Sequence, residues 1–354
     1  MGKINNRNMV KVLIGMSGGI DSTVSALTLK EKGYEVIGIT FKTWTQYRTP
    51  EKIFYNKDEA IKKAQNLAAK LQIEHHVVDL TEVFHRDVIK NFVEEYFCGR
   101  TPNPCVVCNK KIKFKTLVEK AAEYNCDFIA TGHYARIGIE NNRIFIKKAL
   151  DQEKDQSYFL WKLPQEYLNK IIFPLGERYK KKIIAEHEDL EVTNESFEIC
   201  FIPDNNYRNL LLTCDKKISP GDFVLNGKVV GQHKGFCFYT IGQRSGLGIA
   251  VGSPVYVKSI DTKNNIVHLG QEEDLLTDRL ELRDVNMMKF VDFPEDGFEC
   301  DIKIRYRNLG YKGKLFLNSE KKIVILQDKV KSITPGQSAV FYEGEDVIGG
   351  GIIC

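Results

Sequence analysis

The segment from Ser17 to Ser22 reads Ser-Gly-Gly-Ile-Asp-Ser and carries residue types that bind phosphate. It follows an apolar run, Val10 to Ile14, that predicts a buried strand, and it precedes a segment with helical spacing from Thr23 to Lys32. A glycine turn between a strand and a helix points backbone N–H groups and the helix dipole at an anion. The sequence therefore predicts a phosphate-binding loop.

The details of this loop indicate which phosphate chemistry it serves. Gly18 and Gly19 allow a tight turn, Ser17 and Ser22 add hydroxyl donors, and Asp21 is placed to hold a metal-bound pyrophosphate. The loop lacks the lysine of the G-x-x-x-x-G-K-[ST] pattern. It resembles the loop of enzymes that split ATP into AMP and pyrophosphate. The alternative is a glycine-rich turn in an ordinary α/β domain.

Two cysteines are the candidate nucleophiles, Cys108 and Cys200. Cys108 lies near the end of the segment Thr101 to Asn109, which contains two prolines and is expected to be a shaped loop between helices. A basic helix is predicted to start at Lys110, and a helix N-terminus with nearby lysines lowers a thiol pKa. We therefore expect Cys108 to be a reactive thiolate. The spacing of Cys108 and Cys200 does not show whether they meet.

Other roles for the cysteines remain open from the residues alone. Cys105 and Cys108 form a C-x-x-C pair, which is compatible with a redox pair, a metal site or an iron–sulfur site. A zinc site needs two further ligands at short spacing, and the sequence offers none. Each remaining cysteine is most simply a small buried apolar residue.

The elements that must position these residues alternate between strand and helix over the first 200 residues. Further strands are predicted at Glu35–Thr40, His75–Val78 and Asp127–Thr131, and helices at Glu59–Leu71, Thr81–Phe97 and Lys110–Tyr124. This order predicts an α/β fold with a doubly wound parallel sheet. Ligands then lie at the carboxyl ends of the strands, where the Ser17 loop, Phe41 and Gly132 stand. A hairpin is expected from Ala135–Ile137 and Arg143–Ile146.

The pattern changes after about residue 215, where short β-rich runs alternate with glycine turns. One or two small β-domains are expected, with a boundary near Leu276 to Arg283 and a final barrel or sandwich.

Composition limits the class of protein. The 354 residues have 43% hydrophobic and 28% charged content, which is typical of a globular protein of two or three domains. No apolar run reaches the roughly 18 residues of a membrane span, and the N-terminus lacks a signal-peptide pattern. Nine cysteines, an odd number, favour reduced thiols, so we expect a cytoplasmic protein without membrane contact.

The net charge of +4 alone does not indicate a nucleic-acid partner. Basic residues nevertheless gather in three regions, which favours a polyanionic partner. The regions are Gly99–Lys120, Arg178–Lys182 and Lys303–Lys314.

Combined, these motifs resemble the bacterial tRNA-specific 2-thiouridylase family (MnmA/TrmU), within the PP-loop ATP pyrophosphatase superfamily. The resemblance covers essentially the whole chain and seven motifs in order. They are Gly15–Ser22, Gly99–Pro104, Cys108–Lys110 with Lys113-Phe114, Thr131–Ala135, Lys154–Leu160, Ile199–Ile202 and Thr240–Arg244.

The resemblance implies a PP-loop catalytic domain of the N-type over residues 1–205, a central β-rich domain over 206–277 and a tRNA-contacting β-barrel over 278–354. It also implies ATP-dependent 2-thiolation of the wobble uridine, U34, in tRNAs for lysine, glutamate and glutamine. ATP with Mg²⁺ adenylates the C2 oxygen, and a cysteine persulfide then supplies sulfur. An upstream persulfide donor, either a relay protein or a cysteine desulfurase, is the implied partner besides tRNA.

The family's site residues carry over by position. Cys200 carries the persulfide, and Cys108 is the partner nucleophile that ends in a disulfide with it. ATP contacts fall on Gly15, Met16, Ser17, Gly18, Gly19, Ile20, Asp21, Ser22, Phe41 and Gly132. Target-base contacts fall on Asn103, Pro104 and Cys105, and tRNA contacts on His133, Lys154, Asp155, Gln156, Arg305, Tyr306 and Gln337.

Two positions depart from the family pattern. Phe41 stands where methionine is frequent, and either side chain can pack against adenine. Cys105 stands where many members have aspartate, and a thiol replaces a carboxylate poorly because its ordinary pKa is far higher. Cys105, Cys108 and Cys200 together are also a candidate ligand set for a [4Fe-4S] cluster with one open iron. The persulfide route remains our favoured interpretation.

Two other functions would use parts of this sequence. Another PP-loop ATP pyrophosphatase acting on a small molecule would explain the Ser17 loop but not the cysteine pair. A non-catalytic RNA-binding protein would have no use for Asp21, Cys108 and Cys200, all of which are present.

Overall fold

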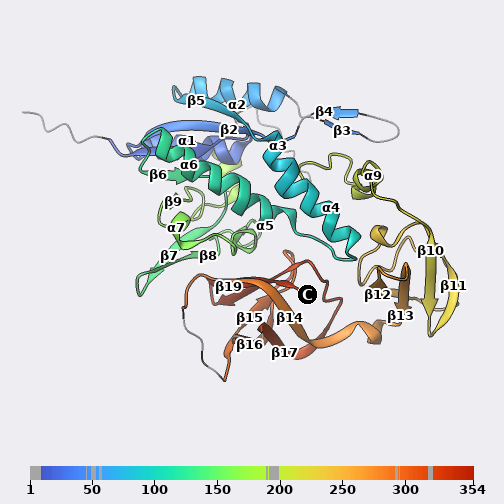
Figure 1. The fold of residues 1–354 in the computed structure, drawn as a ribbon. Helices are drawn as coiled ribbons and strands as arrows, with labels where there is room; N and C mark the ends of the chain where they lie inside the picture. The colour runs from blue at the N-terminus through green and yellow to red at the C-terminus, as the bar shows by residue number, and fades with distance from the viewer. Residues whose placement is uncertain are drawn as a thin grey trace, which may run out of the picture.

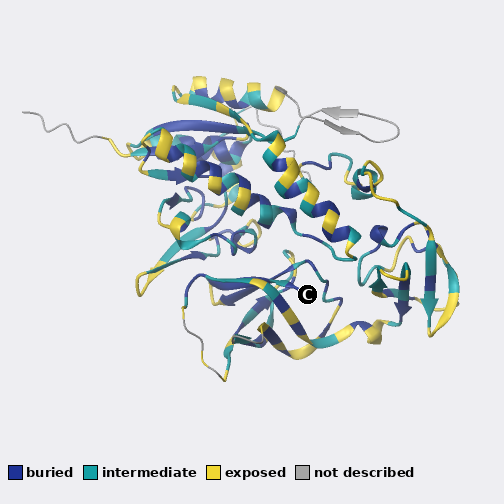
Figure 2. Ribbon diagram, viewed as in Figure 1, coloured by how far each residue is buried: buried dark blue, intermediate teal, exposed yellow. Residues whose placement is uncertain are grey.

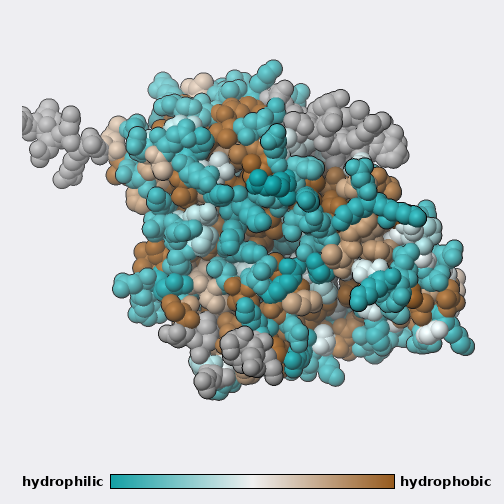
Figure 3. All heavy atoms as spheres, in the orientation of Figure 1, coloured by the Kyte–Doolittle hydropathy of each residue, from teal (hydrophilic) through white to brown (hydrophobic). Residues whose placement is uncertain are grey.

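A computed structural model describes residues 9–44, 46–48, 53–55, 58–188, 190, 199–291, 294, 296–317 and 322–354. An α/β region is followed by two β-rich regions that pack against it (Figure 1). The buried residues lie along the central strands and the inner faces of the helices (Figure 2). Hydrophilic side chains cover most of the face shown in Figure 3, with scattered apolar patches.

The α/β region is built on a five-stranded parallel sheet of order β5-β2-β1-β6-β9. Its strands are β1 (Lys11–Gly15), β2 (Glu35–Lys42), β5 (Glu74–Asp79), β6 (Phe128–Ala130) and β9 (Ile171–Ile172). The chain builds outward from β1 to β5 and then returns to the other side of β1. The sheet is thus doubly wound, as predicted, and its switch point lies between β1 and β6. The two-residue strand β9 is too short for a sequence pattern to reveal.

Helices cover the sheet and connect its strands. They are α1 (Ile20–Glu31), α2 (Asp58–Lys70), α3 (Thr81–Phe84), α4 (Lys90–Phe97), α5 (Pro104–Cys108), α6 (Lys115–Glu123), α7 (Gln165–Leu168), α8 (Lys180–Glu186) and α9 (Tyr207–Leu212). A π-helical segment at His85–Ile89 joins α3 to α4, and another at Asn109–Phe114 joins α5 to α6. In the described part of the chain, no helix is long and apolar enough to cross a bilayer.

The helix that runs without a break from Pro104 to Glu123, here named the central helix, corrects one prediction. The loop expected to extend to Asn109 ends at Asn103. Pro104 begins the helix because its fixed φ suits a first helical position and its missing N–H leaves no hydrogen bond unmade there. Cys105 and Cys108 consequently lie on the helix and not in a loop before it.

The C-terminal region is a closed six-stranded barrel of order β14-β17-β16-β15-β18-β19, in which β19 pairs back to β14. Its strands are β14 (Leu276–Met287), β15 (Phe298–Lys303), β16 (Tyr311–Leu317), β17 (Lys322–Lys331), β18 (Ser338–Glu343) and β19 (Asp346–Ile353). Alternate residues such as Ile302, Val324 and Phe341 fill its interior. The predicted barrel is confirmed.

Three smaller β-units complete the fold. The central sheet has the order β11-β10-β13-β12, and its Phe223 packs in one apolar cluster with Phe92 of α4. The hairpin of β7 and β8 pairs with β19 through Lys147 and Asp346. The strands are β10 (Gly221–Leu225), β11 (Lys228–His233), β12 (Tyr256–Asp261), β13 (Ile266–Gly270), β7 (Arg136–Glu140), β8 (Arg143–Lys147) and the short pair β3 (Gln46–Arg48) and β4 (Ile53–Tyr55).

The barrel and the α/β region share one apolar core. Trp161 is fully buried, its indole Nε1 donates to Ser338 Oγ at 3.0 Å, and Tyr158 OH donates to the Ser338 carbonyl at 2.9 Å. A Cβ on Gly350 would lie 2.6 Å from the Trp161 ring. Only glycine therefore allows the barrel backbone to pack this close to the indole. The barrel therefore has a fixed position over the central helix.

Candidate active site

The loop Gly15–Ser22, here named the pyrophosphate loop, joins β1 to α1 at the carboxyl edge of the sheet. Gly18 has φ +77°, and a Cβ there would lie 2.9 Å from the Ala60 carbonyl oxygen, so both the turn and the packing require glycine. Helix α1 has Gly19 as its N-cap, without a side-chain hydrogen bond to its first N–H groups. The free N–H groups and the helix dipole make this end suited to a phosphate.

Internal hydrogen bonds hold the loop in shape. Ser22 Oγ accepts from the Ser17 N–H at 3.1 Å and donates to the Gly19 carbonyl at 3.0 Å. Met16 and Ile20 are buried in the apolar core. Any contact of these two residues with ATP would therefore use their backbone.

Gly132 brings the second half of the sheet against this loop. It follows β6 directly across the switch point, and a Cβ on it would lie 2.9 Å from Asp21 C and from Ser22 N. Phe41 is partly buried near the end of the adjoining strand β2. The three segments that the sequence placed at the carboxyl edge do end there.

Asp21 has two partners that the sequence did not reveal. Tyr134 OH donates to its Oδ1 at 2.8 Å, and Lys180 Nζ donates to the same oxygen. The side chain of Lys180 is only 16% exposed, so one lysine of the basic run Arg178–Lys182 turns inward while its neighbour Lys181 is 89% exposed. A run of lysines in sequence carries no signal for which one is directed at a site.

The cysteines differ from the expectation of a low thiol pKa. Burial raises the pKa of Cys108 to about 12, and although Lys113 lowers it, Cys200 and Cys105 raise it further. Burial also raises the pKa of Cys105, again opposed by Lys113. The expected lowering of the Cys108 pKa is wrong for the free protein, because this residue lies within the helix with 7% exposure and burial outweighs the effect of Lys113.

Cys200 is the most exposed of the three candidate thiols. Its side chain is exposed, yet the surrounding protein raises its thiol pKa to about 11, with Lys113 opposing and Cys105 adding to the shift. The mutual influence of these groups means that Cys105, Cys108 and Cys200 lie near one another, and we name them the thiol site. All three are free thiols.

Lys113 is the cation shared by the thiol site and by His133. It lies two turns after Cys105 on the central helix and lowers the pKa of all three thiols. Burial, followed by Lys113, lowers the pKa of His133 to about 3, so its imidazole is neutral. His133 Nδ1 is hydrogen-bonded to Thr131 Oγ1 at 2.8 Å, and its ring stacks on Phe114.

The segment Thr131–Tyr134 therefore interacts both with the pyrophosphate loop and with Lys113 of the thiol region. Gly132 and Tyr134 contact the pyrophosphate loop, while His133 interacts with the lysine that influences the thiol site. A phosphate-binding loop and a set of thiols thus adjoin one four-residue strand end.

The thiol site is not arranged around a single metal ion. Within the part of the chain that the structure describes, which includes Cys105, Cys108 and Cys200, no three His, Cys, Asp or Glu side chains gather so as to hold a metal ion. Asp21, placed beside the α1 N-terminus, is the carboxylate suited to a Mg²⁺ that arrives with a nucleotide.

Several residues expected to contact tRNA make contacts within the protein. Asp155 is buried, and its carboxylate accepts from the Ala149 N–H at 3.0 Å and from Ser157 Oγ at 2.8 Å. Gln156 Oε1 accepts from the Tyr134 N–H, and Arg305 donates to the Ser332 carbonyl at 2.5 Å. Lys154 is exposed.

The remaining expected RNA contacts lie where the barrel meets the central helix. Tyr306 packs on Phe159 with ring centroids 4.5 Å apart. Gln337 Nε2 donates to the carbonyls of Thr101 and Pro102, next to Asn103. The structure thus brings the barrel against the segment expected to contact the target base.

Comparison with known proteins matches three family models along the chain. They are described as a tRNA methyl transferase HUP domain at residues 10–204, a tRNA methyl transferase PRC-barrel domain at 214–271 and an aminomethyltransferase β-barrel domain at 277–353. A tRNA-specific 2-thiouridylase MnmA of Cytophaga hutchinsonii is 45% identical, with 97% of each chain covered. One from Clostridium botulinum strain Hall is 46% identical over 97% of this chain and 98% of its own.

Similarity to solved structures is slight. A 4-thiouridine synthetase in complex with RNA and ATP has a TM-score of 0.33 and 16% identity, covering 51% of this chain and 41% of that chain.

Proposed function

This chain belongs to the tRNA-specific 2-thiouridylase family, and on that premise we propose that it is a tRNA-uridine 2-sulfurtransferase. Its substrate is the wobble uridine of tRNAs of the lysine, glutamate and glutamine type. It uses ATP to activate the C2 carbonyl and replaces the oxygen by sulfur, giving 2-thiouridine, AMP and pyrophosphate.

The adjacency at the strand end Thr131–Tyr134 carries this proposal. Gly132 packs against the pyrophosphate loop, and His133 interacts electrostatically with Lys113, the lysine that also lowers the pKa of Cys105, Cys108 and Cys200. A carbonyl activated by ATP and a sulfur nucleophile must act on the same carbon. The two sets of groups are neighbours, as that chemistry requires.

The reaction has two chemical stages. First, the C2 oxygen of the uridine attacks the α-phosphorus of ATP and pyrophosphate leaves. The terminal sulfur of a persulfide on Cys200 then attacks C2, and the C2–O bond breaks as AMP departs with the oxygen and the electron pair. Adenylation is needed because a uridine carbonyl is a weak electrophile and oxide is a poor leaving group.

Cys108 completes the transfer. Its sulfur attacks Cys200 Sγ, the bond from Cys200 to the transferred sulfur breaks, and the electron pair stays on the sulfur of 2-thiouridine. The sulfane sulfur gains two electrons and the cysteines lose two, which leaves a disulfide between them for an external thiol reductant to reopen. An upstream persulfide protein, either a relay protein or a cysteine desulfurase, reloads Cys200.

The binding roles follow the positions described above. ATP with Mg²⁺ is assigned to the pyrophosphate loop, Phe41 and Gly132, and the target base to Asn103, Pro104 and Cys105. The tRNA contacts are assigned to His133, Lys154, Asp155, Gln156, Arg305, Tyr306 and Gln337. Four of these residues would have to keep or exchange internal hydrogen bonds when RNA binds: Asp155, Gln156, Arg305 and Gln337.

The experiment combines purified protein, ATP, Mg²⁺, a persulfide donor and unmodified tRNA, and measures 2-thiouridine by mass spectrometry. Cys200→Ser and Cys108→Ser should abolish the product, while Cys98→Ser, at an exposed cysteine outside the thiol site, should not. Product formation by Cys200→Ser would refute the persulfide route.

Two alternatives give different results in the same system. A small-molecule ATP pyrophosphatase would exchange ATP and pyrophosphate equally well with and without tRNA. An iron–sulfur route predicts stoichiometric iron after anaerobic purification and loss of activity on chelation.

A further inference from the structure

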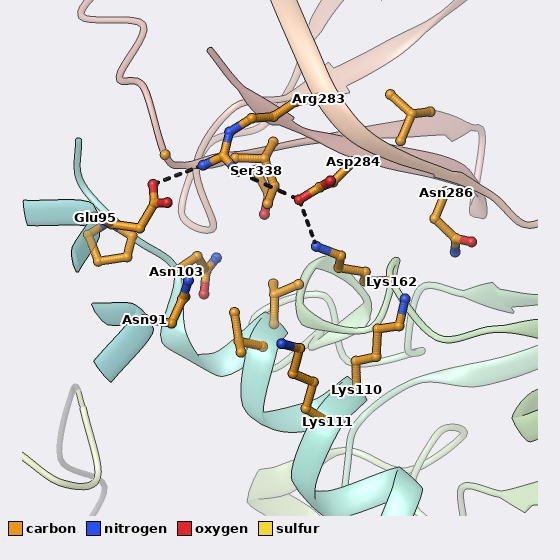
Figure 4. Close-up of a pocket in the computed structure, with 16 residues that line it drawn as sticks. Asn91, Glu95, Asn103, Lys110, Lys111, Lys162, Arg283, Asp284, Asn286 and Ser338 are labelled. Carbon is orange, nitrogen blue, oxygen red and sulfur yellow. Dashed lines mark hydrogen bonds and ion pairs between the residues drawn. The ribbon is translucent and has the colours of Figure 1, made fainter. Parts of the chain in front are cut away.

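A polar cavity of about 410 Å³ lies between the central helix and the barrel (Figure 4). Its walls come from α4, from the first turns of the central helix and from strands β14, β18 and β19. This volume falls within the range of roughly 300–1,000 Å³ that is usual for small-ligand sites. The cavity is therefore large enough for part of a nucleotide.

The cavity is separate from the thiol site. The central helix contributes Val106, Val107, Lys110 and Lys111 to its wall, whereas Cys105, Cys108 and Lys113 are not among the lining residues. The lining residues and the thiol-site residues therefore use different parts of the surface of the central helix, whose segment Asn109–Phe114 is π-helical. Only Asn103 and its neighbour Pro102, just before the helix, connect the cavity to the segment expected to contact the target base.

Positive charge exceeds negative charge around the cavity. Four cations line it, Lys110, Lys111, Lys162 and Arg283, against two carboxylates, Glu95 and Asp284. Figure 4 shows Lys162 directed at Asp284 of the barrel, while Lys110 and Lys111 extend from the central helix into the space between them.

The carboxylates are already engaged. Glu95 is 8% exposed and pairs with Arg283 at 2.9 Å and with Arg100 at 2.7 Å. Asp284 lies 3.5 Å from Lys162 Nζ and 3.6 Å from Arg283. Among the described residues, Lys110 and Lys111 make no side-chain hydrogen bond or close ion pair, although Lys111 is near enough to Asp87 to help lower the pKa of that carboxyl.

The position of Lys162 adds to this imbalance. Its side chain is 18% exposed, and burial lowers its pKa even though Asp284 opposes the shift, while the nearby Lys110 lowers it further. Two lysines held close together in a partly dry cavity repel each other, and a bound anion would relieve that repulsion.

We propose that this cavity binds the phosphate and ribose of an anticodon-loop nucleotide adjacent to the target uridine. The proposal rests on the proposed function and names a substrate subsite for it. Lys110, Lys111 and Lys162 contact the phosphate, and Asn91 and Asn103 supply amide groups for the ribose and base edge. RNA loops are recognised through such splayed nucleotides, and phosphate contacts set their register. Binding of the adjacent nucleotide in this cavity would fix where the target base reaches Asn103, Pro104 and Cys105.

The test uses anticodon stem–loops in which one loop phosphate at a time is replaced by a neutral methylphosphonate. Affinity is measured for the wild-type protein, for Lys110→Gln/Lys162→Gln and for Lys111→Gln. In the wild type, one substitution beside the wobble nucleotide should weaken binding about tenfold, roughly the effect of losing one buried phosphate contact. In either lysine variant, the same methylphosphonate should weaken binding less than about threefold.

Lys115→Gln serves as the matched control on the same helix, because Lys115 is exposed and pairs with Glu119 at 3.8 Å outside the cavity. It should show the full tenfold effect of the methylphosphonate. The exposed Lys111 keeps the test informative if the double variant fails to fold.

The outcomes separate the two proposals. If the wild type does not thiolate the unmodified stem–loop or tRNA, the proposed function fails. Suppose that the wild type thiolates tRNA, but that at every loop position the methylphosphonate weakens binding equally in the wild type and in the lysine variants. Only the subsite is then refuted. Inhibition of RNA binding by free phosphate that equals inhibition by the unmodified stem–loop would likewise refute it, since that result describes a general anion site.

Discussion

Gln337 of the barrel donates from one amide nitrogen to two backbone carbonyls of the α/β region, Thr101 at 3.0 Å and Pro102 at 3.1 Å. The Thr101 N–H returns a bond to Pro335 at 2.8 Å, and a Cβ on Gly336 would lie 2.7 Å from the Thr101 carbonyl oxygen. The barrel thereby holds the backbone that leads into Asn103 and the central helix.

Gln337→Leu should loosen this contact, because two partly buried carbonyls lose their donor. Hydrogen exchange at the Thr101 amide should quicken in the absence of RNA, and folding stability should fall by about 1–3 kcal/mol. Unchanged exchange together with weaker tRNA binding would instead assign Gln337 to direct RNA contact alone.

Gly132→Ala should weaken ATP binding. The new methyl group would lie 2.9 Å from backbone atoms of Asp21 and Ser22, so the pyrophosphate loop or β6 would have to shift. We expect the Kd for ATP, measured by calorimetry, to rise about tenfold or more, with tRNA binding in the absence of ATP unaffected. Normal ATP affinity would mean that Gly132 lies outside the nucleotide site.

Lys180→Gln should also weaken ATP binding, for an electrostatic reason. Lys180 is the cation paired with Asp21, and its loss leaves an unneutralised carboxylate next to the phosphates. We expect roughly a tenfold increase in the Kd for ATP. Lys181→Gln is the matched control because Lys181 is 89% exposed.

Further substitutions sharpen that comparison. The double variant Asp21→Asn/Lys180→Gln should bind ATP about as well as Asp21→Asn alone, since the carboxylate charge that Lys180 neutralises is gone. Similar losses for Lys180→Gln and Lys181→Gln would contradict a specific role for the inward lysine.

The thiol pKa values predict a steep pH dependence in the free protein. Only the thiolate reacts, so alkylation of Cys200 by iodoacetamide should rise about tenfold per pH unit below its pKa of about 11. Lys113→Gln should slow alkylation at pH 8, because the cation that lowers the pKa is lost, whereas Lys115→Gln should not. The alkylation rate is measured by mass spectrometry, and a rate that stops rising below pH 9 would contradict the high pKa.

The regular features of the fold were predictable because they depend on local patterns. Alternating apolar runs and helical spacing indicated the doubly wound sheet, and glycine turns indicated the later β-domains. The start of the central helix was missed because Pro104 has two meanings: proline ends loops and also begins helices. The short strand β9 was missed because two residues carry no periodicity.

Sequence by itself determined the residue types of the site: a glycine turn able to approach a phosphate, an aspartate beside it, and thiols that can carry sulfur. Tertiary structure alone decided their electrostatics. Burial of Cys108 raised a pKa that local sequence suggested was low, and packing chose Lys180 and Lys113 from runs of equivalent lysines. The physical reason is that charge interactions and desolvation depend on distance and depth in the fold, which neighbouring residues in the chain do not specify.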